Sequence, residues 1–163
     1  MLGDIQIFTE GAFGYPGDNP FAVAASSTLI NAGEPVAITL GNSTGNVVTP
    51  AATNTPVVGT NYMAGIAGTT STNTASLAGG VYVTQLSTQI SYLIAPKVAA
   101  TWDTQAEYDA LVGARVLFDL TAGVYTILAA DGSTNGLVVL PLDVRKYPGK
   151  VRFAIRGGVS FLA

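Results

Sequence analysis

The fold class is decided by residues 115–129, which read RVLFDLTAGVYTILA. Two runs rich in β-branched and aromatic residues, 115–120 and 124–129, flank Thr121-Ala-Gly123. Side chains of these types fit the pleated surface of a sheet, and a glycine between two such runs is typical of a turn. The stretch therefore predicts two strands joined by a turn.

Similar runs continue on both sides of this stretch. They lie at 36–40, 62–67, 81–86, 90–95, 137–140 and 151–155. In the last run Val151, Phe153 and Ile155 alternate with Arg152 and Ala154, which is the period of a half-buried strand. Together the runs predict a mainly β protein, either a small β-barrel or a sandwich domain.

One short helix is expected at about 104–112. Thr104 and Glu107 have the spacing of a capping box, and Gly113 is a typical residue after a helix end. Tyr108, Leu111 and Val112 would form the buried stripe of this helix, because they lie at positions i, i+3 and i+4.

Residues 1–21 differ from the rest of the chain. They contain Gly11, Gly14, Pro16, Gly17 and Pro20, so this stretch is neither a helix nor a central strand. Yet the stretch is strongly apolar, which favours an arm that buries its side chains on a partner; an N-terminal strand tucked into its own domain is the alternative. We therefore expect an arm at 1–21, a single β-rich domain at 22–163, and partner contacts through Ile5, Ile7, Phe8, Phe13 and Tyr15.

The composition excludes several kinds of chemistry. The 163 residues include no histidine and no cysteine, which rules out disulfides, thiolate nucleophiles and Ser-His or Cys-His mechanisms. We expect no catalytic residue, no metal and no cofactor. No stretch resembles a signal peptide or reaches the length of a membrane-spanning helix, so we also expect no membrane partner.

Charges are few and unevenly placed. Only 10% of the residues are charged, against about 25% in an ordinary domain. Such a surface favours permanent packing against partners. The alternative is a surface that the abundant Thr, Ser, Asn and Gln residues keep hydrated. The net charge of −3 gives no reason to expect a nucleic-acid partner.

All seven basic residues lie after residue 96, and five of them fall within 145–156: Arg145, Lys146, Lys150, Arg152 and Arg156. A strand edge protected by charge is the simplest interpretation. An electrostatic contact with an acidic partner, including the acidic head of a neighbouring copy, is the alternative, and DNA is the least favoured.

Three motif-like patterns point to turns or to no particular site. Residues 41–45 match G-x-S-x-G, but neither a helix nor a histidine is there to make a nucleophile elbow. Residues 131–136 resemble the start of a calcium loop, but Leu142 stands where the bidentate glutamate should be. Among ten acidic residues, nothing selects the pair that a glycoside hydrolase would need.

Two stretches carry a resemblance to a known family. Residues 20–38 (PFAVAASSTLINAGEPVAI) and 58–72 (VGTNYMAGIAGTTST), the latter followed by Val81-Tyr-Val83, are similar to the head decoration (cement) proteins of tailed bacteriophages. The resemblance covers roughly 20–97 and consists mainly of small and apolar residues.

The resemblance implies a β-barrel-like or β-tulip domain that trimerises on the outer surface of an icosahedral capsid. The arm would then lie on the major capsid protein, and the protein would stabilise the virion without catalysis. A β-rich tail, fibre or receptor-binding module is the alternative; a surface cluster of Trp102, Tyr62 and Tyr82 would favour it. A hydrolase would require two acids to meet in a cleft.

Overall fold

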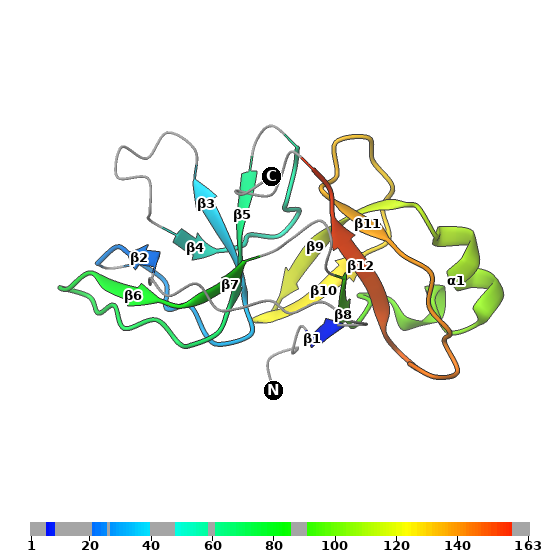
Figure 1. The fold of residues 1–163 in the computed structure, drawn as a ribbon, viewed down its shortest axis with the longest axis horizontal. Coiled ribbons are helices and arrows are strands. Elements are labelled where there is room, and N and C mark those ends of the chain that lie inside the picture. The colour runs from blue at the N-terminus through cyan, green and yellow to red at the C-terminus, as the bar shows by residue number, and fades with distance from the viewer. Residues whose placement is uncertain are drawn as a thin grey trace.

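A computed structural model describes residues 6–8, 21–25, 27–39, 48–58, 61–85 and 91–157. Within these residues the protein is mainly β, with three sheets and one short α-helix (Figure 1). The predicted fold class is therefore confirmed.

The largest sheet has six strands, all antiparallel to their neighbours. In sheet order they are β1 (Gln6–Phe8), β8 (Ser91–Ile94), β12 (Val151–Ile155), β11 (Leu137–Val139), β9 (Arg115–Thr121) and β10 (Val124–Leu128). The turn predicted at 121–123 joins β9 to β10, and Ala122 and Gly123 both have positive φ there.

The six-stranded sheet is curled. Its last strand, β10, meets the residues that directly follow β8, since Lys97 N–H donates to Ile127 O and Ile127 N–H donates to Ala95 O. This contact is a single bridge between Pro96 and Ile127. Among the described residues the three sheets are open. Of the two expected architectures, a small β-barrel or a sandwich, a closed barrel is thus not found.

Two smaller sheets lie beside the curled sheet (Figure 1). A four-stranded antiparallel sheet contains, in order, β4 (Val48–Pro50), β3 (Pro35–Thr39), β5 (Asn61–Ala67) and β7 (Val83–Gln85). A two-stranded sheet pairs β2 (Phe21–Val23) with β6 (Gly79–Val81). The single strand expected at 81–86 is thus divided between two sheets.

The larger hydrophobic core lies between the six-stranded sheet, the helix and one face of the four-stranded sheet. A chain of aromatic rings crosses it: centroids are 5.5 Å apart in Tyr92–Phe153 and Phe118–Phe153, and 6.2 Å apart in Phe118–Tyr125. Tilted and edge-to-face pairs of this kind add about 0.5–1.5 kcal/mol each beyond their buried area.

A second core lies on the opposite face of the four-stranded sheet. On β3, Val36 and Ile38 point into the second core, whereas Ala37 points into the larger one. Strand β3 therefore belongs to both cores, which ties the smaller sheets to the curled sheet.

The segment 51–58, which follows β4, also joins the four-stranded sheet to the curled sheet. It runs antiparallel along β9: Phe118 N–H donates to Thr55 O at 2.7 Å, and Asn54 N–H donates to Phe118 O at 2.8 Å. The buried hydroxyl of Tyr125 donates to Ala51 O at 2.6 Å.

The helix α1 spans Gln105–Leu111 and follows a short 3-10 helix, η1 (Ala99–Thr101). Thr104 caps α1, and both hydrogen bonds of the predicted capping box with Glu107 are present. Of the expected stripe, Tyr108 is fully buried and Leu111 packs against the core. Val112 is exposed because the helix has ended and the chain turns at Gly113.

No helix among the described residues is long and apolar enough to cross a membrane. The turn expected at 41–45 lies outside the described residues.

Candidate functional site

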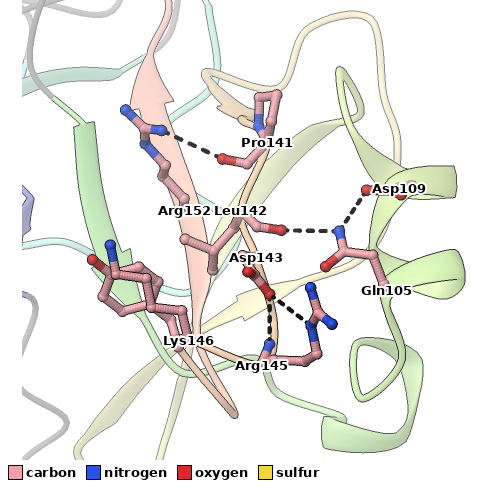
Figure 2. Close-up of a pocket in the computed structure, with 9 residues that line it drawn as sticks. Gln105, Asp109, Pro141, Leu142, Asp143, Arg145, Lys146 and Arg152 are labelled. Carbon is pink, nitrogen blue, oxygen red and sulfur yellow. Dashed lines mark hydrogen bonds and ion pairs between the residues drawn. The ribbon is translucent and has the colours of Figure 1, made fainter.

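A cavity of about 440 Å³ lies between α1 and the segment 141–152 (Figure 2). Five charged side chains line it: Asp109, Asp143, Arg145, Lys146 and Arg152. Within the described part of the chain, no group of three acidic residues could hold a metal ion.

Gln105 connects α1 to one wall of this cavity. Its amide nitrogen donates to Asp109 Oδ1 at 2.7 Å and to Leu142 O at 3.0 Å, and its amide oxygen accepts a hydrogen bond from Val144 N–H (Figure 2). One side chain therefore fixes the helix against the 142–144 backbone.

Tyr108 and Arg152 make a second connection between α1 and the strands. The Tyr108 hydroxyl donates to Leu140 O at 3.0 Å and accepts from Arg152 N–H at 2.9 Å. Burial raises the pKa of Tyr108 to about 12, so the hydroxyl stays protonated. The guanidinium of Arg152 donates to Ser91 Oγ and Pro141 O, and these contacts occupy it within the fold.

The outer wall contains Asp143, Arg145 and Lys146. The backbone N–H of Arg145 and its Nε donate to Asp143 Oδ1 at 3.0 and 3.4 Å, and together they hold the pKa of the Asp143 carboxyl below its usual value. Lys146 Nζ lies 5.4 Å from the ring centroid of Tyr147, at the distance of a cation–π contact.

The five basic residues of 145–156 are not gathered in one place. Arg145, Lys146 and Arg152 line the cavity. Lys150 lies half-buried after the Pro148–Gly149 turn, in which Gly149 has a positive φ. Arg156 lies at the other end of β12, where its Nη1 donates to Ser133 O and Asn135 O.

The cavity does bring two carboxylates together, Asp109 and Asp143. Glycoside hydrolysis needs one carboxyl group that is still protonated near neutral pH. The pKa of Asp143 is shifted the other way, and Asp109 accepts the hydrogen bond from Gln105. The arrangement can attract a small anion through Lys146, but its other polar groups already hold the helix, the loop and the strand together.

In the loop that resembles a calcium site, the side chains of Asp131 and Asn135 are hydrogen-bonded to backbone groups of the loop and of Arg115 on β9. Asp131 Oδ1 accepts a hydrogen bond from Arg115 N–H at 2.8 Å. The Asn135 amide donates to Arg115 O and Ala130 O, and Asn135 N–H closes a turn on Gly132 O. These contacts agree with the β-turn interpretation.

The expected partner-contact residues lie largely outside the described residues. Ile5, Phe13 and Tyr15 are not described, and Ile7 and Phe8 are described in backbone only. Their strand, β1, pairs with β8 in the register Gln6↔Leu93, Ile7↔Tyr92 and Phe8↔Ser91. For these three residues this is the arrangement of an N-terminal strand paired within its own domain.

Sequence reasoning missed a second cavity, of about 370 Å³, lined by Thr69, Thr70, Thr72, Gly80 and Tyr82. The sequence TTSTNT at 69–74 gave no signal for it, because the burial of Ser71 and Asn73 between exposed threonines is visible only in the structure.

This chain matches no protein-family model, no curated protein and no solved structure.

Proposed function

We propose that this protein is a structural component of a virion: a decoration (cement) protein that binds the outer surface of an icosahedral bacteriophage capsid and stabilises it. It would bind as a trimer, with its N-terminal arms on the major capsid protein. A role of this kind uses no catalytic residue, metal or cofactor.

The observation that carries the proposal is the distribution of charge. Residues 19–96 contain a single charged residue, Glu34. Its side chain is buried, and it accepts hydrogen bonds from the backbone and the side-chain amide of Asn31. The end of the molecule built from β2 to β7, opposite α1 in Figure 1, therefore presents no charge from this stretch.

An uncharged end suits a protein that is permanently assembled. Surface charge normally keeps domains apart in solution, and a large surface without it is typical of an interaction site. Apart from Glu34, the charged residues of the described chain fall within 97–156, and this part of the molecule would face solvent. A subunit attached to a shell has this kind of polarity.

Strand β1 pairs with β8 of its own domain, so the proposal needs the other side of β1 for the shell. It lies at the edge of the six-stranded sheet, and its ladder with β8 is three residues long. On a capsid, the outer side of β1 would pair with an edge strand of a capsid protein, where main-chain hydrogen bonds supply affinity. Three arms on one trimer would then bind together more tightly than one arm alone.

Co-sedimentation with empty, expanded phage heads tests the proposal. We expect the full chain to sediment with the heads and a variant lacking residues 1–15 to remain in the supernatant. Because the deletion also removes β1 from the edge of β8, the double substitution Phe13→Ser/Tyr15→Ser is the matched variant that keeps β1. Retention of full binding by both variants would refute the arm assignment.

A surface cluster of Trp102, Tyr62 and Tyr82 would favour the alternative, a receptor-binding module, but Trp102 is not on the surface. Trp102 is only 2% exposed and packs edge-on against Tyr108, with ring centroids 5.6 Å apart. It is therefore part of the core and is not a platform for a sugar.

A further inference from the structure

We propose that one face of the uncharged end is a contact surface for a second copy of this chain. The face consists of Leu29, Thr69, Thr70, Thr72, Gly80 and Tyr82, and we call it the Thr/Tyr face. This inference rests on the proposed function and deepens it, because it names the surface through which neighbouring subunits associate.

The Thr/Tyr face is the outer side of a small layer made of three segments, residues 29–30, 69–72 and 80–82. Ile30 and Ser71 exchange hydrogen bonds: Ile30 N–H donates to Ser71 Oγ at 2.9 Å, and Ser71 N–H donates to Ile30 O at 2.8 Å. Thr72 N–H donates to Gly80 O at 3.1 Å, and the Thr72 hydroxyl accepts from Gly80 N–H.

Side chains alternate across this layer. Ile30, Ser71 and Val81 point inward and are buried at the second core. The residues next to them in the chain point outward: Leu29 is 44% exposed, Tyr82 is 45% exposed, and Thr70 and Thr72 are exposed. Thr70, Thr72 and Tyr82 line the 370 Å³ cavity together with Thr69 and Gly80, so this part of the face is hollowed rather than flat, and Leu29 lies outside the lining.

The chemistry of the face favours a protein contact. Leucine and tyrosine supply apolar area, and threonine loses little side-chain entropy when it is covered. No lysine, arginine or glutamate is present to resist dehydration. A lipid headgroup or a nucleic acid would require cations, and residues 1–96 contain none.

A second copy is the partner that fits best. A charged group facing the Thr/Tyr face would lose its water without gaining a counter-charge, so the opposing surface must itself be uncharged. The uncharged end of a neighbouring copy meets this condition. Threonine hydroxyls both donate and accept hydrogen bonds, so they can pair with the hydroxyl and amide groups that such a surface offers.

Sedimentation velocity over a range of protein concentrations tests the inference. Leu29→Lys/Tyr82→Lys places two charges on the face, and we expect self-association at least about 100-fold weaker than that of the unchanged protein. Val98→Lys/Val112→Lys is the matched control, because it adds the same charge at exposed apolar positions beside η1 and α1. This control should associate as the unchanged protein does.

Should the first double variant fail to fold, as judged by circular dichroism, Leu29→Lys alone provides the same test, because Leu29 belongs to the face and is 44% exposed. The inference is overturned if the unchanged protein is a monomer at every concentration, or if charges on the face weaken association no more than the control charges do. Loss of binding to phage heads with association intact would count against the proposed function alone.

Discussion

Tyr108 shows how much one side chain can hold in this molecule. Its ring is fully buried against Trp102, while its hydroxyl bridges Leu140 O and Arg152 N–H. These two backbone groups belong to the residue after β11 and to β12, so a single hydroxyl links the helix to both strands. A phenylalanine would fill the same space but would leave both backbone groups without this partner.

We therefore expect Tyr108→Phe to lower the free energy of unfolding by about 1–3 kcal/mol, the usual cost of leaving buried polar groups unpaired. Urea denaturation followed by circular dichroism would measure it. Tyr82→Phe is the control, since Tyr82 is 45% exposed and should change stability by less than about 0.5 kcal/mol. Equal effects of the two substitutions would contradict the bridging role.

Asp119 is a buried carboxylate in the described part of the chain with a close cationic partner. Lys97 Nζ lies 2.7 Å from its Oδ1, and the Thr121 hydroxyl donates to its Oδ2 at 2.8 Å. The hydrogen bond from Lys97 is the main cause that holds the pKa of Asp119 below its usual value. Since the folded pKa is the lower one, the stabilisation is present above the unfolded pKa of about 4 and is lost as the pH falls below it.

Asp119→Asn should accordingly lower stability at pH 7 by about 1 kcal/mol, a small value because the Lys97 side chain is 41% exposed. The difference from the unchanged protein should shrink as the pH is lowered from 5 to about 3. Unfolding free energies measured across that range would show it. A difference that stays constant with pH would mean that the ion pair is not its source.

Strand β5 contains a β-bulge, a feature of the whole strand rather than of one residue. It pairs Gly65 with Val36 and Met63 with Ala37, so Ala64 is an extra residue and the strand contains a bulge. The extra residue shifts the alternation: Met63 and Ile66 enter the larger core, and Ala64 and Ala67 enter the second. Bulky and small residues are thereby sorted between the two cores.

Gly65 allows this bulge because β7 passes very close to it. A Cβ atom at this position would lie 2.1 Å from Thr84 O and 2.3 Å from Val83 Cγ1. We expect Gly65→Ala to destabilise the protein by about 2–3 kcal/mol or more, because backbone must move to relieve the overlap. Thermal unfolding would measure the loss.

Gly68→Ala is the matched control for that substitution. Gly68 follows β5 directly, and a Cβ there would meet Tyr82 O at an ordinary 3.6 Å. A change in melting temperature for Gly68→Ala as large as for Gly65→Ala would show that the close approach is not the cause.

At the scale of the whole molecule, the two cores share strands and should unfold together. Ile30 is fully buried in the second core, whereas Trp102, the single tryptophan, lies in the larger core. Strands β3 and β5 send side chains into both. A substitution that destabilises the second core should therefore also shift the unfolding transition that Trp102 reports.

We expect Ile30→Ala to cost about 2–5 kcal/mol, as large-to-small changes in a core do, and to shift the denaturation midpoint seen by Trp102 fluorescence. Leu29→Ala, at the neighbouring exposed position, should leave that midpoint almost unchanged. An unshifted Trp102 transition in Ile30→Ala, together with an earlier transition in circular dichroism, would mean that the two cores unfold separately.

The amino-acid sequence by itself determined the features that depend on near neighbours. Runs rich in β-branched and aromatic residues located β9 and β10, and the alternation at 151–155 located β12. The spacing of Thr104 and Glu107 located the start of the helix. Such features follow from local sterics and from hydrogen bonds across three or four residues, so composition and spacing suffice to predict them.

The tertiary structure alone decided how distant segments meet. Only folding pairs residues 51–58 with β9, divides the run at 81–86 between two sheets, and separates Arg156 from Arg145 and Lys146. Folding also forms both cavities and exposes Leu29 and Tyr82 on one face. These outcomes depend on contacts between residues far apart in the chain, and a local sequence pattern does not contain the energies of such contacts. The surface proposed for assembly is therefore visible only in the tertiary structure.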